Sequence, residues 1–266
     1  MDVDKIKIAA AGDNCMDVYD QQNMVFPGGN PVNVAVYAVR LGARASYIGA
    51  VGTDVYGQMM KNALKAKDVD ISHMKVLCGS TAVTHVCLVN GERELGDYHE
   101  GVTADFHADQ EDIAFFAQHD MFVTGLWGHM ENVLPEIKAS GVPVAFDFAT
   151  ACDDPIIDCA APYTDYAFFS DDSGDEAALR IFMKTIYDKG AGHVIVTRGE
   201  RGSLAFDWLN WYSCGIVRCR VVDTMGAGDS FIAGFLVEIL RGGNIKEAME
   251  AGARNSSITL GYQGAW

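Results

Sequence analysis

One glycine-rich junction near the C-terminal end of the chain carries the residue types that phosphoryl transfer needs. It reads DTMGAGD over residues 223–229. Small residues let backbone N–H groups converge at the start of a helix, where unpaired donors and the positive end of the helix dipole attract phosphate. We therefore predict an anion hole at Gly226, Ala227 and Gly228. Asp229 follows in the first helical turn, where a carboxylate can deprotonate an attacking hydroxyl, so we interpret it as the catalytic base.

The residues after this junction help to decide between catalysis and a plainer role. Glycine-rich turns often precede helices, and an aspartate in a first turn can simply complement the helix dipole. Ala233 and Gly234 are small enough for the helix to pack closely on a sheet. Because glycine costs helix stability, Gly234 should have a packing reason. This favours a catalytic interpretation of the junction.

Alternating strand-like and helical patterns predict an α/β fold. The strand-like runs cover residues 6–11, 47–51, 121–124, 144–148, 166–169 and 193–197. Apolar runs without polar alternation suit strands that are covered on both faces, as in a mostly parallel central sheet. Ligands of such folds bind at the carboxyl ends of the strands.

A second glycine-rich segment precedes another expected helix. We expect Asn30 to cap this helix with Pro31 at its first position, and the helix to stop at Gly42. Its N-terminal end would then present Gly29, Asn30 and Asn33 to a ligand.

The segment 80–105 departs from the helix–strand alternation. Asn90-Gly91 lies between two strand-like runs and predicts a hairpin turn. No internal repeat or linker divides the chain, so we regard this hairpin as an insertion into a single domain.

Composition excludes several classes of protein. The 266 residues are 49% hydrophobic and carry a formal net charge of −16, which disfavours nucleic-acid and anionic-membrane partners. No apolar run is long enough for a membrane span, and residues 1–5 are too acidic for a signal peptide, so we expect a cytoplasmic protein. The seven cysteines include no Cys-x-x-Cys pair, which argues against a disulfide framework or a zinc site, and we expect most of them to be buried.

Other catalytic motifs are missing from the sequence. The chain has no Gly-Lys dipeptide, hence no Walker A loop, and no Gly-x-Gly-x-x-Gly follows a strand-like run. Gly-x-Ser-x-Gly and His-Glu-x-x-His are absent as well, which removes the simplest hydrolase and zinc-peptidase hypotheses.

The two glycine-rich segments together resemble a known family. Residues 223–229 resemble the second signature of the ribokinase-like, or PfkB, carbohydrate kinases, and GGNPVNVA at 28–35 with VGTD at 51–54 resembles the first. The resemblance extends over nearly the whole chain. It implies a ribokinase-like three-layer α/β sandwich forming one domain over residues 1–266. Segments of about 14–28 and 80–105 would form a small β-strand lid over the sugar, and such lids can pair into homodimers.

The same resemblance implies roles for individual residues. Asp229 would be the base, and a carboxylate near its ordinary pKa of about 4 suffices for that role. ATP with Mg²⁺ would supply the phosphate. The remaining sites would be Asp13, Gly28, Gly29, Asn30 and Asn33 for the sugar, Thr224, Gly226, Ala227 and Gly228 for phosphate, and Thr197, Gly199, Gly202 and Asn255 for the nucleotide.

One motif departs from the family pattern. Many members carry Asn-x-x-Glu after the strand at 166–169, where the glutamate helps to organise magnesium, whereas this chain reads SDDS over residues 170–173. The magnesium ligands stay unassigned, with Asp171, Asp172, Glu176 and ATP itself as candidates. A requirement for a monovalent cation cannot be derived from this sequence.

Four further segments narrow the substrate. Residues 12–19, 96–106, 127–129 and 264–266 resemble the branch of the family that phosphorylates fructosamines at the 6-hydroxyl. Fructoselysine, the Amadori product of glucose with lysine, would then be the substrate. Its ammonium groups could meet the clustered acids Asp97, Glu100 or Asp105, although these can equally be solvated turn charges. A kinase for fructose or another ketose or fructosamine, and a sugar-binding regulator without turnover, remain as alternatives.

Overall fold

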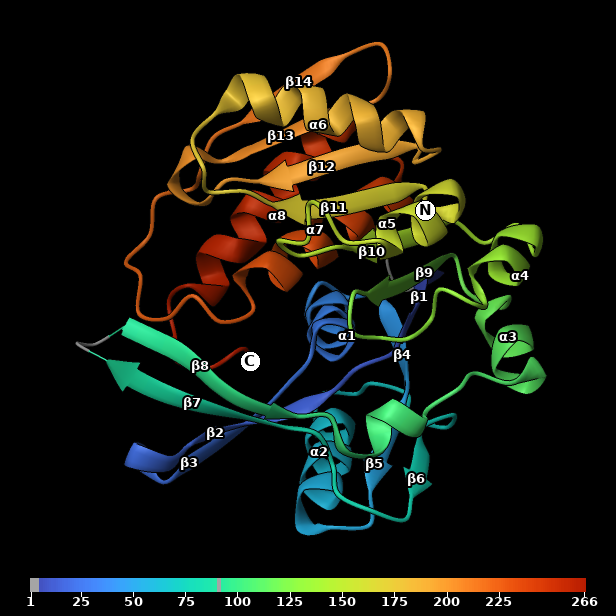
Figure 1. Cartoon of the computed structure of the whole chain (residues 1–266), viewed down its shortest axis with the longest axis vertical. Coiled ribbons are helices and arrows are strands. Elements are labelled where there is room, and N and C mark those ends of the chain that lie inside the picture. Colours follow the sequence, from blue (N-terminus) through green and yellow to red (C-terminus); the bar gives the residue numbers. More distant parts are fainter. Residues whose placement is uncertain (1–4, 90–91) are drawn as a thin grey trace.

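An eight-stranded sheet forms the centre of the protein. The computed structural model describes residues 5–89 and 92–266 (Figure 1). Neighbouring strands from β4 to β12 are all parallel, and only the last two pairings at one edge are antiparallel. This confirms the predicted mostly parallel sheet. The strand order is β14 (Trp211–Cys214), β13 (Ser203–Phe206), β12 (His193–Thr197), β11 (Tyr166–Ser170), β10 (Val144–Asp147), β9 (Met121–Gly125), β1 (Lys7–Ala11) and β4 (Arg44–Ile48).

Helices cover both faces of this sheet, which makes three layers (Figure 1). The side chains of β1 point alternately to the two faces of the sheet. Ile8 and Ala10 belong to one hydrophobic cluster, and Ala9 and Ala11 belong to the other. This period of two buries both faces of the strand. The first cluster receives α1 (Asn30–Arg40), α2 (Val55–Ala66), α7 (Ala227–Arg241) and α8 (Ile245–Thr259), and the second receives α3 (Gln110–Phe116), α4 (Leu134–Ala139), α5 (Ile156–Ala160) and α6 (Glu176–Asp188).

A separate four-stranded sheet projects from one side of the central sheet (Figure 1). Its order is β3 (Met24–Gly28), β2 (Cys15–Tyr19), β7 (Val83–Val89) and β8 (Glu92–His99). These strands come from the two segments in which we expect the lid. Asn90-Gly91, the predicted turn, lies outside the described residues.

Short elements complete the chain. Two strands, β5 (Ala50–Gly52) and β6 (Lys75–Leu77), form a small parallel sheet. Single 3₁₀ turns are η2 (Asp20–Gln22), η3 (Gly101–Asp105), η4 (Ala161–Tyr163) and η5 (Gly199–Arg201). Among the helices of residues 5–89 and 92–266, none has both the length and the apolar character needed to cross a bilayer.

The start of α1 differs from the sequence expectation. The helix begins at Asn30 and ends at Arg40, but its cap is Gly29, and the side-chain oxygen of Asn30 accepts no hydrogen bond from the first-turn amides. Asn30 therefore does not act as the cap. Its side chain is directed to two carboxylates instead, as described below.

The strand expected at 47–51 is two strands. β4 ends at Ile48, β5 begins at Ala50, and Gly49 lies between them, where a Cβ would come within 2.2 Å of the Tyr47 hydroxyl. The cysteines also differ from expectation. None of the six described cysteines is buried or in a disulfide, and Cys78, Cys152, Cys159 and Cys219 are exposed.

Gly234 has a packing reason, but the partner is a helix and not the sheet. A Cβ built at this position would lie 2.8 Å from the Ala251 carbonyl oxygen and 3.0 Å from the Gly252 Cα. On the other side of the contact, Gly252 accommodates the Phe231 ring, which would lie 2.8 Å from an added Cβ. The two glycines let α7 and α8 approach closely at the C-terminal end of the chain.

We expect Gly234→Ala to destabilise the protein. Alanine improves helix propensity by about 1 kcal/mol, but the added methyl meets rigid backbone of α8, and such overpacking costs about 1–3 kcal/mol. Urea unfolding monitored by circular dichroism measures the difference. Gly215→Ala is the control, because nothing lies within 4 Å of a Cβ at that position. A Gly234→Ala protein as stable as the control variant would contradict close helix packing.

Candidate active site

The glycine-rich junction forms an amide-lined helix start. Gly226 caps α7 with a φ of 70°, and a Cβ there would lie 2.4 Å from the Tyr37 hydroxyl. Gly228 faces open space, with nothing within 4 Å of a Cβ position. Backbone bonds within the described chain engage the amides of Ala227 and Ser230 and leave those of Gly228 and Asp229 open. Open amides beside free space are what an anion hole requires.

Asp223 fixes the loop before this helix. Its Oδ1 accepts the Met225 amide at 2.7 Å, and its Oδ2 accepts the amide of Gly264 at 2.8 Å. The side chain therefore ties the loop to the C-terminal segment. Thr224 is exposed in this loop, and its carbonyl accepts the Ala227 amide at 3.3 Å.

Two asparagines from the first turn of α1 hold the carboxylate of Asp229. Asn30 Nδ2 donates to Oδ1 at 2.7 Å, and Asn33 Nδ2 donates to Oδ2 at 2.6 Å. The indole Nε1 of Trp266 donates to Asn33 Oδ1 at 2.8 Å, which fixes the direction of that amide. Each carboxylate oxygen keeps acceptor capacity for a substrate hydroxyl. The helix starts of α1 and α7 thus meet at the predicted base.

Asp13 lies directly beside this pair of asparagines. Its Oδ2 accepts the backbone amide of Asn30 at 3.2 Å, whereas its Oδ1 is buried and has no partner among the described residues. Gly29 has a φ of 110°, and a Cβ there would lie 2.6 Å from Asn14 Cα. At Gly28 a Cβ would lie 2.7 Å from Asp17 Oδ2. A buried acceptor without a donor is suited to a sugar hydroxyl.

Asp147 is a third carboxylate that the sequence did not single out. It ends β10, and its Oδ2 accepts a second hydrogen bond from Asn30 Nδ2, at 2.7 Å. The available signal was an aspartate at the carboxyl end of an apolar strand, which is where α/β folds bind ligands. One asparagine amide thereby joins Asp147 to Asp229.

Burial changes the acidity of all three carboxyl groups. Burial raises the pKa of Asp229 to about 6, against the opposing effect of the hydrogen bonds from Asn33 and Asn30. Burial also raises the pKa of Asp13 to about 6 and, with the Asp229 charge next in importance, that of Asp147 to about 7. The sequence expectation of an ordinary pKa near 4 for the base is therefore corrected. Perturbed carboxyl groups that share hydrogen bonds are typical of catalytic sites.

The residues expected at the nucleotide lie around β12 and η5. Thr197 ends β12, Gly199 begins η5 with a φ of 54°, and Gly202 caps the end of η5 with a φ of 76°. Asn255 is buried between α7 and α8, where its Nδ2 donates to the Ser230 carbonyl at 2.7 Å and its Oδ1 accepts from Arg40 at 2.7 Å. The oxygen and the nitrogen of the Asn255 side-chain amide are therefore both hydrogen-bonded within the protein. The expected contact of Asn255 with adenine stays a prediction.

The candidate magnesium ligands are engaged in other contacts. Glu176 pairs with Arg180 at 2.8 Å and with Arg198 at 2.9 Å, and Asp171 accepts the Ser173 amide at 3.0 Å. Over the described residues, no group of three or more His, Cys, Asp or Glu side chains forms a metal site. Magnesium usually binds through one or two carboxylates and the substrate phosphates, so a protein cage is not needed.

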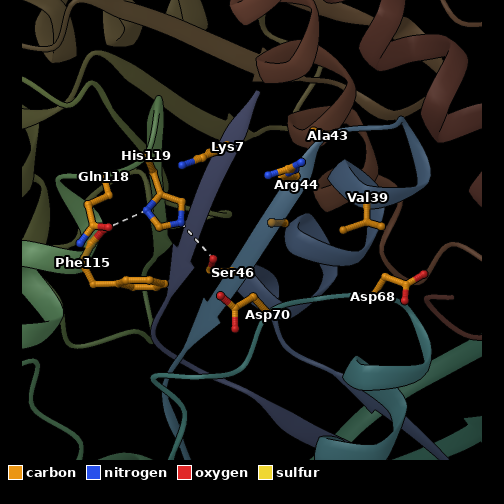
Figure 2. Close-up of a pocket in the computed structure, with 11 residues that line it drawn as sticks. Lys7, Val39, Ala43, Arg44, Ser46, Asp68, Asp70, Phe115, Gln118 and His119 are labelled. Carbon is orange, nitrogen blue, oxygen red and sulfur yellow. Dashed lines mark hydrogen bonds between the residues drawn. The ribbon is translucent and has the colours of Figure 1, made fainter. Parts of the chain in front are cut away.

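A hollow in the structure lies away from these residues. It has a volume of about 440 Å³, and Lys7, Arg44, Ser46 and His119 are among its lining residues (Figure 2). Lys7 and Arg44 begin the parallel strands β1 and β4, whereas Asp13 follows the opposite end of β1. Since ligands of α/β folds bind at the carboxyl ends, this hollow is not the site described above.

The family can now be stated from comparison with known proteins. The model of the pfkB family carbohydrate kinases matches residues 6–266. The chain belongs to this family. Members of this family are phosphotransferases with a hydroxyl acceptor. This confirms the enzyme class that we predicted from the two glycine-rich segments.

Individual relatives agree with this family. The fructoselysine 6-kinase of Shigella flexneri is 46% identical over 97% of this chain and 99% of its own length. The fructosamine kinase FrlD of Bacillus subtilis is 36% identical over 98% of this chain and 93% of its own. The structure of Arabidopsis thaliana ribokinase complexed with ribose and ATP aligns with a TM-score of 0.87 at 18% identity, covering 98% of this chain and 93% of that one. That likeness confirms the ribokinase-like fold.

The raised pKa of Asp229 predicts the acid limb of the pH–rate profile. A base acts deprotonated, so with a pKa of about 6 the value of kcat/KM for the sugar should fall about tenfold between pH 7 and pH 5. Asn33→Ala removes a hydrogen bond that lowers this pKa, and its acid midpoint should lie at higher pH than that of the wild type.

Initial rates at saturating ATP and magnesium measure both profiles. Asn62→Ala on α2 is the control, because Asn62 bonds only the exposed Gln58 among the described contacts. A midpoint that is unchanged or lower in Asn33→Ala would show that Asp229 does not set the acid limb.

Proposed function

We propose that this protein is an ATP-dependent kinase that phosphorylates the 6-hydroxyl of fructoselysine and gives fructoselysine 6-phosphate and ADP. One observation carries the chemistry: the Asp229 carboxylate, oriented by Asn30 and Asn33, lies in the helix turn that also presents open amides. The base and the phosphate site are then within the same turn of α7. The fructoselysine 6-kinase and fructosamine kinase relatives support the choice of substrate.

The proposed reaction requires one proton acceptor and one anion hole. Asp229 accepts the proton of the 6-hydroxyl while the sugar oxygen forms its bond to the γ-phosphorus and the bond from that phosphorus to the ADP oxygen breaks. The amides of Gly228 and Asp229 stabilise the charge on the transferring group. Asp13 Oδ1 would accept a hydrogen bond from a ring hydroxyl and fix the sugar.

ATP would enter from the side of β12 and η5. Thr197, Gly199 and Gly202 lie there, and both glycines have positive φ values, a conformation that favours glycine. Magnesium bound to the ATP phosphates would neutralise their charge. Asp147 is the carboxylate best suited to face that ion, because it lies beside Asp229 and carries no salt bridge among the described contacts.

The four-stranded sheet supports the proposed lid and a dimer through it. It places β3 and β8 at its two edges, without further strand partners in the described chain. Unpaired edge strands are suited to pairing with a second copy. Sedimentation of the wild-type protein would measure its oligomeric state.

A substrate panel tests the proposed activity. ADP release by purified protein with magnesium and ATP is measured with fructoselysine, fructose, ribose and no sugar at equal concentrations. We expect turnover with fructoselysine well above that with fructose. Turnover on fructose alone would keep the kinase mechanism and discard the fructosamine substrate, because Asp13, Asn30 and Asn33 face hydroxyls that both sugars share. No turnover with any sugar would favour a non-catalytic binder.

The role of Asp229 is tested by Asp229→Asn. Loss of a general base should reduce kcat by about 10²- to 10⁴-fold and leave ATP affinity nearly unchanged. Glu238→Gln is the matched control, because it makes the same chemical change near the other end of α7. Wild-type turnover in folded Asp229→Asn would exclude this residue as the base.

A further inference from the structure

A second pair of charged side chains lies where the four-stranded sheet joins the core. His129 Nε2 is hydrogen-bonded to a carboxylate oxygen of Glu100. Glu100 directly follows β8, and His129 lies in the loop after β9. The side chains are 36% and 44% exposed, so a ligand can reach both. None of the catalytic steps above uses them.

Close backbone contacts fix both ends of this pair. The loop that carries His129 is pressed against the residue before Asp13, since a Cβ at Gly12 would lie 2.5 Å from Gly128 Cα. His129 itself has a φ of 53°, an uncommon conformation for a side chain of this size. Gly101, next to Glu100, has a φ of 55°, and a Cβ there would lie 2.2 Å from the Ser80 carbonyl oxygen. The pair is therefore held by backbone packing and not only by its own contact.

The pair lies beyond Asp13, away from Asp229. Asn30 contacts Asp229 through its side chain and Asp13 through its backbone amide. His129 is close enough to Asp13 to lower the pKa of that carboxyl, against the larger effect of burial. Burial raises the pKa of Tyr98, and the charges of Asp13 and Glu100 add to this effect. Hydrogen bonds therefore link Asp229 to Asn30 and Asn30 to Asp13, and the loop that carries His129 packs against Gly12, next to Asp13.

The order of these residues in space matches the order of the functional groups along a fructosamine. With the 6-hydroxyl at Asp229 and ring hydroxyls at Asp13, the carbon that carries the amine lies at the opposite end of the sugar. That amine is a secondary ammonium group at neutral pH and needs a negatively charged acceptor. Resting on the proposed function, we propose that Glu100, oriented by His129, binds this ammonium group and distinguishes fructosamines from simple ketoses.

Glu100 is better placed for this than the other two acids of the segment. Asp97 and Asp105 are exposed, and neither makes a hydrogen bond to the core within the described residues. Of the three, only Glu100 has a described hydrogen bond to the loop that is packed against Gly12. A charged hydrogen bond in a partly enclosed site contributes more to binding than one in solvent.

Glu100→Gln tests the proposal through a comparison of two sugars. Its KM for fructoselysine should rise about 10- to 100-fold, because an amide lacks the charge that attracts an ammonium group. Its KM for fructose, or the inhibition constant where fructose turns over slowly, should stay within about twofold, since fructose has no amine. Glu100→Asp keeps the charge and should recover part of the affinity. Asp105→Asn, the same kind of change at an exposed position, should match the wild type.

Each outcome supports or overturns a defined statement. A loss confined to fructoselysine supports amine binding by Glu100. An equal loss for both sugars would show that Glu100 only positions the lid, and no loss for either would show that the amine binds elsewhere. A wild-type protein that does not turn over fructoselysine would overturn the proposed function, and this inference with it.

Discussion

The meeting of two helix starts at one carboxylate is the constraint on which the site depends. Asp229 begins α7, and the amides that hold it, Asn30 and Asn33, begin α1. Carboxylates repel one another when buried, so Asp13, Asp147 and Asp229 can lie together only with donors between them. Asn30 supplies these donors, with its side chain on two of them and its backbone amide on the third. Displacing α1 relative to α7 would separate Asp229 from both asparagines.

The C-terminal part of the chain keeps these helices in place. Arg40, at the end of α1, donates to Asn255 at 2.7 Å and to Thr259 at 3.0 Å, both on α8. The close α7–α8 contact at Gly234 completes this arrangement. The indole of Trp266 bonds Asn33, so it orients a side chain that holds Asp229. Rigid positioning of this kind is the main contribution of an enzyme to phosphoryl transfer.

Burial gives the site its chemical character and has an energetic cost. Raised pKa values at Asp13, Asp147 and Asp229 mean that the folded protein binds their protons more tightly than the unfolded chain. The contribution of these three carboxyl groups to the free energy of unfolding therefore decreases as pH rises from about 4 to about 7. Carboxyl groups with perturbed pKa values are common at functional sites. With a pKa of about 6, the Asp229 carboxylate is still mostly deprotonated at neutral pH and is more basic than that of an exposed aspartate.

The sequence by itself determined the fold class and placed Asp229 in a glycine-rich helix start, because continuous apolar runs and small residues before a helix are local properties of the chain. It also indicated the two asparagines through the glycine-rich segment at 28–35, and Asp13 through the resemblance to the family. Only the tertiary structure showed that Asn30 bridges carboxylates and does not cap its helix, that Gly234 packs on α8, and that Asp147 belongs to the site. These features join residues up to 199 positions apart in the chain. Local patterns cannot specify such contacts, since burial and pKa depend on which distant elements pack together.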